Sequence, residues 1–334
     1  MHKFFIMFNK IISLENLLVA WEEFLKGKRK KLDVQEFGFN LTDNIIRLHN
    51  DLANGNYRHG GYQEFKISDP KPRIIHKASV RDRLLHHAIH RVLYPHFDRF
   101  FICDSFSCRI GKGTHAALNR FKRLCFKISK NDTRTCWILK GDIRKYFASI
   151  DQSILVNMIA KYILDKQVVD LLNEVIFSFN SGTIGKGIPL GNLTSQIFAN
   201  IYLNELDQYL KHGLKVENYI RYADDFVILS EDKKYLVSLI PQIKRFLQES
   251  LKLELHPDKV FIKTLCSGVD FLGWVHFIDH RVLRTISKKR MYYKISHNHC
   301  NESLQSYLGL LKHGNAIKLK QKLLAYYNGN KIDN

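Results

Sequence analysis

The sequence predicts an α+β fold, because short strand-like segments are mixed with helical ones and two strands carry acids at their ends. Residues 137–143 form an apolar, strand-like run that ends at Asp142. Residues 218–229 predict a β-hairpin with Asp224 and Asp225 at its turn, since β-favouring residues flank both acids. Residues 193–210 carry apolar side chains at three-and-four spacing, which predicts a helix.

The N-terminal part of the chain predicts two helices and a hairpin. Ser13 is expected to cap an amphipathic helix that runs to Phe24. Residues 62–69 and 73–76 are short extended segments separated by prolines, which predicts an antiparallel hairpin. A second helix is expected over residues 79–94.

Further elements follow towards the C-terminus. Residues 154–179 predict one or two helices, and residues 181–189 form a glycine-rich loop. A helix is expected over residues 233–251. The segment Phe271-Leu-Gly-Trp274 is expected to open another strand, and the tail from Ser287 is basic and helical.

Charge is the strongest signal in the composition. The chain of 334 residues is 45% hydrophobic, enough for a folded core, and its formal net charge is +20. Basic residues cluster at Lys26–Lys31 and again over residues 281–334. Such an excess repels itself unless a polyanion neutralises it, so nucleic acid is the expected partner. The alternative is a soluble basic surface with no partner.

The cysteines and the apolar runs indicate a cytoplasmic protein. The six cysteines are scattered and form no CxxC pair, so no zinc ribbon is expected and a reducing compartment fits. The first ten residues contain a short apolar run without a small-residue cleavage site. No apolar run has the length of a membrane span, so no membrane partner is expected.

The acids at the strand ends predict a metal-dependent reaction. Two adjacent acids in a turn are common by themselves, but Asp142 supplies a third acid on a neighbouring strand. Three such carboxylates would hold two Mg²⁺ ions about 4 Å apart. One ion would activate a 3′-hydroxyl and the other would neutralise a leaving pyrophosphate, which is in-line phosphoryl transfer.

Four motifs in order resemble those of reverse transcriptases. They are Asp142-Ile-Arg-Lys-Tyr-Phe147, Gly187-Ile-Pro-Leu-Gly-Asn-Leu-Thr-Ser-Gln196, Tyr222-Ala-Asp-Asp225 and Phe271-Leu-Gly273. The resemblance extends upstream to about residue 70. It implies a right-hand polymerase with an antiparallel palm sheet and a helical thumb. The fingers would be residues 1–135 with 152–184 inserted, the palm would lie within 136–279 and the thumb would be 280–334. No endonuclease, maturase or RNase H domain is expected.

The resemblance also assigns roles at the catalytic centre. Asp142, Asp224 and Asp225 would be the catalytic acids and would bind two Mg²⁺ ions, for which Mn²⁺ can substitute. The carbonyl of Ile143 would add a metal ligand. Lys259 matches the lysine that would protonate the leaving pyrophosphate.

A second set of residues would contact the incoming dNTP. Phe147 matches the aromatic gate that excludes a 2′-hydroxyl, although an ordinary core role is the alternative. Basic side chains in the fingers would pair with the triphosphate and the template, or else form a solvated basic face. The basic side chains are those of Lys71, Arg73, Arg81 and Arg83. Gly191 and Gln196 of the glycine-rich motif would also contact the dNTP. Leu190 and Arg73 would affect fidelity.

The glycine-rich motif narrows the resemblance. Leu190-Gly191-Asn-Leu-Thr-Ser195-Gln196 has the form typical of reverse transcriptases from diversity-generating retroelements, and residues 104–115 are similar to that group as well. This implies bacterial, archaeal or phage origin and a specific non-coding template RNA copied with errors at adenines. It also implies an RNA–cDNA duplex and a small basic accessory protein as partners. Antiphage defence-associated and group II intron or retron-like enzymes are the alternatives.

Two further alternatives concern the activity itself. Charge alone would suit an inactive RNA-binding protein on a polymerase scaffold, but the three acids and Phe147 argue against it. An RNA-dependent RNA polymerase would also carry paired acids, whereas Phe147 favours dNTPs.

Overall fold

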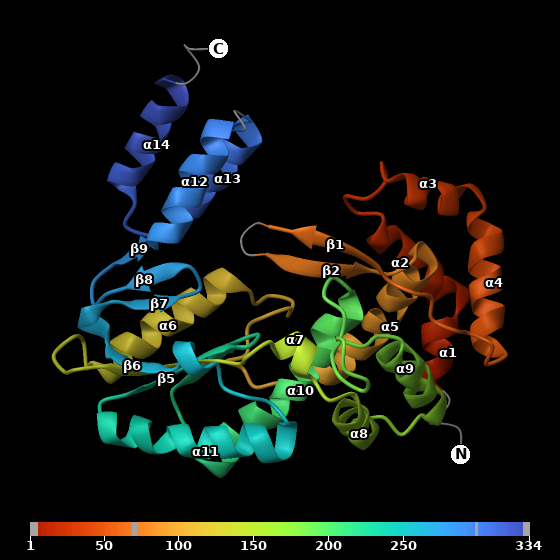
Figure 1. Ribbon diagram of the computed structural model, residues 1–334, viewed down its shortest axis with the longest axis horizontal. Coiled ribbons are helices and arrows are strands. Elements are labelled where there is room, and N and C mark those ends of the chain that lie inside the picture. Colours follow the sequence, from red (N-terminus) through yellow and green to blue (C-terminus); the bar gives the residue numbers. More distant parts are fainter. Residues whose placement is uncertain (1–5, 69–71, 298–299, 330–334) are drawn as a thin grey trace.

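A four-stranded antiparallel sheet with the strand order β4-β5-β3-β6 lies at the centre of the protein (Figure 1). The computed structural model describes residues 6–68, 72–297 and 300–329. The central strands are β3 (Trp137–Asp142), β4 (Tyr219–Tyr222), β5 (Asp225–Ser230) and β6 (Phe261–Thr264). They are rich in Ile, Val, Leu and aromatic residues, which favour a buried pleated sheet. The predicted strand that ends at Asp142 is confirmed.

Helices surround this sheet. In chain order they are α1 (Ile6–Ile12), α2 (Leu14–Phe24), α3 (Leu32–Phe39), α4 (Leu41–Ala53), α5 (Val80–Asp98), α6 (Thr114–Ile128), α7 (Tyr146–Ser149), α8 (Gln152–Tyr162), α9 (Lys166–Phe177), α10 (Leu193–Gln208), α11 (Lys233–Leu251), α12 (Thr285–His297), α13 (Asn301–Leu311) and α14 (Ile317–Gly329). The predicted helices over 79–94, 193–210 and 233–251 are confirmed, with small shifts at their ends. No helix in the described part of the chain is both long and apolar enough to cross a membrane.

The two faces of the central sheet belong to two hydrophobic clusters. Phe226 and Ile228 of β5 join the cluster that contains α11, whereas Val227 and Leu229 join the cluster that contains α6. This alternation is the period of two expected of a strand buried on both faces. Helices α6 and α11 therefore cover opposite faces of the sheet (Figure 1).

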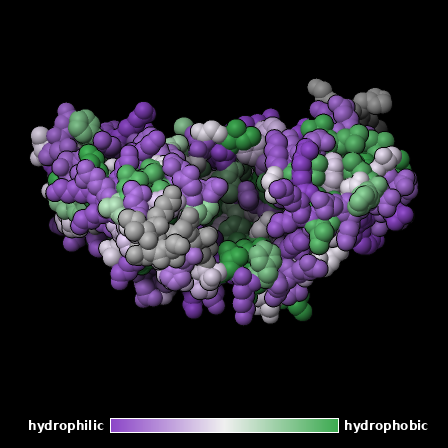
Figure 2. Space-filling model, turned by 90° about the horizontal axis from the view of Figure 1, so that it is seen from above, coloured by the Kyte–Doolittle hydropathy of each residue, from purple (hydrophilic) through white to green (hydrophobic). Residues whose placement is uncertain are grey.

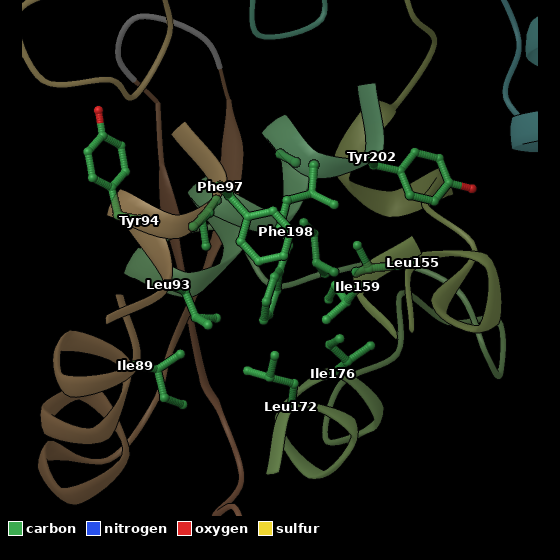
Figure 3. Close-up of a cluster of buried hydrophobic side chains, with 14 of the residues drawn as sticks. Ile89, Leu93, Tyr94, Phe97, Leu155, Ile159, Leu172, Ile176, Phe198 and Tyr202 are labelled. Atoms are coloured by element: carbon green, nitrogen blue, oxygen red, sulfur yellow. The ribbon is translucent and has the colours of Figure 1, made fainter. Parts of the chain in front are cut away.

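The cluster that contains α11 extends to the helices on the N-terminal side. Figure 3 shows Leu93 of α5, Leu155 of α8, Leu172 of α9 and Phe198 of α10 converging on one cluster of side chains. Residues 154–179 thus contain two helices, where the sequence predicted either one or two. The break between them is capped by Asp165, whose carboxylate accepts from the backbone N–H groups of Val168 and Phe8 at 3.4 and 3.0 Å.

The hairpin predicted near residue 70 is confirmed. Strands β1 (Gln63–Ile67) and β2 (Arg73–Lys77) pair antiparallel, with Phe65 opposite Ile75. The preceding α2 begins after Ser13, whose hydroxyl accepts from the N–H of Asn16 at 3.2 Å, so that cap is also confirmed.

The segment from Phe271 to Trp274 differs from the prediction. A strand does begin in this segment, β8 (Trp274–His276), but only at Trp274, and Phe271 ends a preceding strand, β7 (Val269–Phe271), that was not predicted. Leu272 and Gly273 form a two-residue turn with φ values of 50° and 87°, and two successive positive φ values are typical of a tight hairpin turn. Strand β9 (Arg281–Leu283) completes a second antiparallel sheet.

The molecule is hollowed between its two halves. The C-terminal helices α12, α13 and α14 stand on one side, and the β1–β2 hairpin with the N-terminal helices stands on the other (Figure 1). Seen from above, a recess lies between these halves, and its rims are mostly hydrophilic (Figure 2). The predicted helical nature of the basic tail is confirmed.

Candidate active site

The central sheet brings two predicted catalytic acids directly opposite each other. In the antiparallel pairing of β3 and β5, Asp142 is the partner of Asp225. Directly opposite residues of neighbouring strands have their Cβ atoms about 5 Å apart, where like charges repel. Gly141, beside Asp142, lies under the Phe226 ring, and a Cβ atom there would approach that ring within 2.2 Å. The strand therefore has no room for a side chain next to this acid.

The third acid lies at the tip of the β4–β5 hairpin. Tyr222 pairs with Asp225, so only Ala223 and Asp224 form the turn. Ala223 has a φ of 54°, an uncommon conformation for a residue with a side chain. The predicted hairpin is confirmed, but Asp225 is the first residue of β5 and only Asp224 occupies the turn.

A buried ion pair anchors this hairpin to α10. The side chains of Arg221 and Asp207 are 1% and 0% exposed, and two guanidinium nitrogens of Arg221 donate to Asp207 at 2.7 and 2.6 Å. Arg221 also donates to the carbonyl of Ala223 at 3.1 Å and to Asn200 at 3.3 Å. The turn that carries Asp224 is therefore hydrogen-bonded to a side chain held by the helix behind it.

Two lysines lie beside the acids. Lys259 Nζ is 2.9 Å from Asp142 Oδ1, so the structure brings this predicted residue into the site. Lys140 Nζ is 3.5 Å from Asp225 Oδ1, close enough for an ion pair, yet that oxygen accepts no hydrogen bond in the described structure. Lys140 also donates to the carbonyl of Asp270 at 3.0 Å.

Burial and mutual repulsion make the acids hard to ionise. Burial and the neighbouring Asp142 carboxylate raise the pKa of Asp224 to about 6. Burial also raises the pKa of Asp225, although Lys140 opposes the shift. Such carboxylates are stabilised when a cation neutralises them.

The donor set suits a hard divalent cation, but the side chains do not form a ready-made metal site. The buried Asp225 Oδ1, which accepts no hydrogen bond, is the kind of oxygen that Mg²⁺ or Mn²⁺ would coordinate. Within residues 6–68, 72–297 and 300–329, no group of three or more His, Cys, Asp or Glu side chains is arranged to hold a metal ion. Lys259 and Lys140 instead lie against two of the acids. Ile143 is buried and forms a bridge with Leu255.

The residues predicted to contact the dNTP base and sugar gather beside the β1–β2 hairpin. The carbonyl of Leu190 accepts from the N–H of His76 at 2.9 Å. Gly191 has a φ of 113°, and a Cβ atom there would lie 2.8 Å from Ile75, so glycine suits this contact. Phe147 is half-buried, and its carbonyl accepts from the N–H of Ile188 at 2.9 Å.

Two of the residues predicted to make polar contacts with the dNTP are exposed, and a third cannot be placed. Arg73, at the start of β2, and Gln196, in the first turn of α10, are both exposed. Lys71 lies outside the described residues.

Two arginines predicted to contact phosphate are already paired with acids of the N-terminal helices. Arg83 donates to Asp33 at 2.6 Å and lies over the ring of Phe24. Arg81 donates to Asp51 at 2.7 Å. A contact with the triphosphate would therefore require each guanidinium to exchange its carboxylate partner for phosphate. Asp33 and Asp51 could not be recognised as partners from sequence spacing, because both lie far from the arginines along the chain.

The sequence reasoning missed Lys140, Arg221 and Asp207. A signal existed for the first two. Lys140 lies two residues before Asp142, so both side chains fall on one face of β3. Arg221 is a charge inside an apolar strand, which requires a buried partner. Nothing in the spacing identified that partner as Asp207.

Comparison with known proteins adds to this geometry. The family model described as "Reverse transcriptase (RNA-dependent DNA polymerase)" matches residues 66–276. Protein YkfC of Escherichia coli is 28% identical over 283 residues, covering 72% of this chain and 71% of YkfC. The group II intron-encoded protein LtrA of Lactococcus lactis is 25% identical over 337 residues, covering 79% of this chain but 54% of LtrA.

Solved structures show the same fold. Apo telomerase from Candida tropicalis matches with a TM-score of 0.54 at 12% identity, over 81% of this chain and 57% of that one. Telomerase from Candida albicans matches with a TM-score of 0.53 at 11% identity, over 82% and 55%. The predicted α+β fold of the right-hand polymerase type is confirmed.

The buried ion pair predicts a specific pattern of stability. Replacing Arg221 by Met leaves the Asp207 carboxylate buried and unpaired, so we expect the free energy of unfolding to fall by about 3–5 kcal/mol. The double variant Arg221→Met/Asp207→Leu buries no unpaired charge and should recover most of that loss. Urea denaturation of the three proteins measures both values. A double variant no more stable than Arg221→Met would contradict the assignment.

The raised pKa of Asp224 predicts that replacing this acid by a neutral residue stabilises the protein, and that the gain depends on pH. Because the folded state holds this proton more tightly than the unfolded state, ionisation destabilises the protein as pH rises from about 4 through about 6. In buffer with a metal chelator, Asp224→Asn should therefore be about 2 kcal/mol more stable than the parent at pH 8. The difference should shrink towards pH 4, where the parent side chain is also neutral. A difference in unfolding free energy that stays constant over this range would disprove the electrostatic explanation.

Proposed function

This chain belongs to the reverse transcriptase (RNA-dependent DNA polymerase) family, and we propose that it copies an RNA template into DNA at Asp142, Asp224 and Asp225. The observation that carries the proposal is the pairing of Asp142 with Asp225 across β3 and β5, beside the turn that presents Asp224. Three carboxylates on a rigid sheet are the arrangement that metal-assisted phosphoryl transfer needs.

The three carboxylates and the Ile143 carbonyl would hold two Mg²⁺ ions, or Mn²⁺ in their place. When bound, such ions supply activation of the primer 3′-hydroxyl and charge neutralisation at the leaving pyrophosphate. The protein's own part is to hold the carboxylates in place through the β3–β5 ladder and the Arg221 network. Lys259 would exchange its ion pair with Asp142 for the pyrophosphate and donate a proton to it.

Selection of dNTPs is assigned to Phe147, with Arg73, Gly191 and Gln196 around the nucleotide. The carbonyl of Phe147 accepts from the N–H of Ile188, which holds the backbone at position 147 against the glycine-rich loop. Lys71 and Arg83 belong to the proposed set as well, and Arg83 would exchange its ion pair with Asp33 for the triphosphate.

We also propose that Leu190 and Arg73 influence fidelity together. The carbonyl of Leu190 is hydrogen-bonded to His76, and His76 and Arg73 belong to the same short strand. A shift of β2 would therefore move both residues relative to the template.

The division into fingers, palm and thumb is part of the proposal. The fingers would comprise residues 1–135 and 152–184, the palm would contain the central sheet within 136–279, and the thumb would be residues 280–334. The template RNA and its RNA–cDNA duplex would lie in the recess between thumb and fingers, whose rims are mostly hydrophilic (Figure 2). The net charge of +20 supports a polyanionic partner there. A cytoplasmic location is also proposed, since all six cysteines are free.

We further propose that the template is the non-coding RNA of a diversity-generating retroelement, copied with errors at adenines with the help of a small basic accessory protein. The Leu190-to-Gln196 motif supports this role. The likeness to LtrA equally suits a group II intron-like enzyme, and an antiphage defence role is a further alternative. Sequencing the RNA and cDNA that copurify with the protein tests these roles. Substitutions confined to adenines are expected, and a faithful or repetitive cDNA would count against the retroelement.

One observation favours a second candidate, an inactive RNA-binding protein. No group of side chains in the described ranges forms a ready-made metal site, and lysines lie against two of the acids. The raised pKa of Asp224 weighs against this candidate, since a scaffold without a cation gains nothing from a buried, repelled carboxylate.

A primer-extension assay separates the two candidates. With a primed RNA template, dNTPs and Mg²⁺, the parent protein should extend the primer, and Asp224→Asn should reduce the rate at least about a thousandfold, since metal-held charge stabilises the transition state. Asp258→Asn, an exposed acid near Lys259, is the matched control and should retain activity. Unchanged extension by Asp224→Asn, or none by the parent protein, would overturn the proposal.

The dNTP preference should depend on the size of the side chain at position 147. Phe147→Ala would open space for a 2′-hydroxyl, so we expect ribonucleotide incorporation to rise about tenfold or more relative to dNTPs. Phe126→Ala, an exposed phenylalanine of α6, is the control and should leave the preference unchanged. Extension with rNTPs as efficient as with dNTPs in the parent protein would instead favour an RNA-dependent RNA polymerase.

A further inference from the structure

A second candidate site lies at the junction of the C-terminal helices with the rest of the protein. A cavity of about 430 Å³ is enclosed by α6, the turn between β8 and β9, and the loop between α13 and α14. Its volume is within the range of sites for small ligands. None of the residues assigned to polymerisation lines it. Helix α14, which follows one of its walls, stands on the side of α12 away from the β1–β2 hairpin (Figure 1).

The lining of this cavity is cationic. Lys122 of α6, Arg281 of β9 and Lys312 after α13 all line it. No acid of the described chain forms an ion pair with any of the three. The one acid in the lining, Asp279, is exposed and already paired with His280 at 2.6 Å. Positive charges from separate elements that face one cavity attract an anion.

Two buried nitrogen atoms of the lining lack partners. His276 is 4% exposed, and its Nε2 forms no hydrogen bond within the described structure. The same is true of Nη1 of Arg281. A buried polar atom left unpaired is costly, and a ligand that pairs with it would remove this cost. Burial lowers the pKa of His276 to about 4, so its ring is neutral near pH 7. Oxygen atoms of an anion would accept from Arg281 and from the Nε2–H tautomer of neutral His276.

The walls of the cavity are held in place without a ligand. Arg281 donates to the carbonyl of His313, and its own carbonyl accepts from the N–H of Asn315 at 2.8 Å. The ring of His313 stacks on that of His115 in α6 with 3.6 Å between centroids. A Cβ atom at Gly314 would approach Trp274 within 2.0 Å, so the loop fits closely against β8. A site with pre-formed walls loses less entropy on binding.

We propose that this cavity binds a phosphate group, through Arg281, Lys122, Lys312 and His276. Phosphate matches a guanidinium with free donors and two ammonium groups. Two sources can supply this chemistry: a free mononucleotide, or the terminal phosphate of a nucleic-acid strand. The proposal does not depend on the polymerase activity, since the cavity shares no residue with the acid cluster.

Binding calorimetry on the full chain tests the proposal with three probes. They are inorganic phosphate, adenosine 5′-monophosphate, and a short oligonucleotide with and without a 5′-phosphate. We expect saturable binding of at least one phosphate-bearing probe, weakened at least tenfold by Lys122→Gln/Lys312→Gln. Both lysines are exposed, so the double variant should fold. Lys127→Gln/Lys318→Gln removes the same charge from α6 and α14 outside the cavity and should bind like the parent.

The probes identify the source. Tight binding of the mononucleotide would indicate a free nucleotide, whereas a preference for the 5′-phosphorylated oligonucleotide over its unphosphorylated form would indicate a strand end. Oligonucleotide binding that is equally weakened by both double variants would reflect general charge and would overturn the site. Absence of saturable binding by every phosphate-bearing probe would overturn it as well. His276→Phe, which keeps a ring but removes the unpaired nitrogen, should weaken the same probe.

Discussion

The ion pair between Arg221 and Asp207 is the interaction on which the geometry of the catalytic centre depends. It joins β4 to α10 in a region where neither side chain reaches solvent, and it extends through Arg221 to the carbonyl of Ala223. The hairpin that carries two acids and the helix that begins at the glycine-rich motif therefore cannot move independently. A buried pair of this kind adds little net stability over apolar residues, because desolvation of both charges offsets their attraction. Its effect here is to fix the position of the turn.

The acids that this pair positions destabilise one another. Asp142 and Asp225 are direct cross-strand neighbours, Asp224 is beside them, and Ala223 adopts a φ of 54° to make the turn possible. Lys259 and Lys140 relieve part of the repulsion. The arrangement is therefore unfavourable for a protein that only needs to fold, and favourable for one that binds cations. The cationic cavity beside α6 is the reverse case, in which Lys122, Arg281 and Lys312 converge and none of them pairs with the one acid of the lining, Asp279.

The sequence predicted this centre better than its surroundings. Asp142, Asp224, Asp225 and Lys259 come together as expected, because strand period and turn chemistry are local properties. A strand does begin at Trp274 as expected, but the preceding strand β7 was missed, since three residues are too few to show alternation. The arginines of α5 could not be judged from spacing, because their partners Asp33 and Asp51 are brought to them by the packing of the N-terminal helices.

By itself, the sequence determined the class of fold, the order of its strands and helices along the chain, and the identity of the acids. These follow from periodicity, turn residues and motif order, which depend on residues that are close together in the sequence. Only the tertiary structure decided which charges meet. It placed Asp207 under Arg221, a lysine beside each of Asp142 and Asp225, and Lys122, Arg281 and Lys312 around one cavity. The physical reason is that an electrostatic partner is selected by distance and burial in space, and distant segments carry no local sign of either.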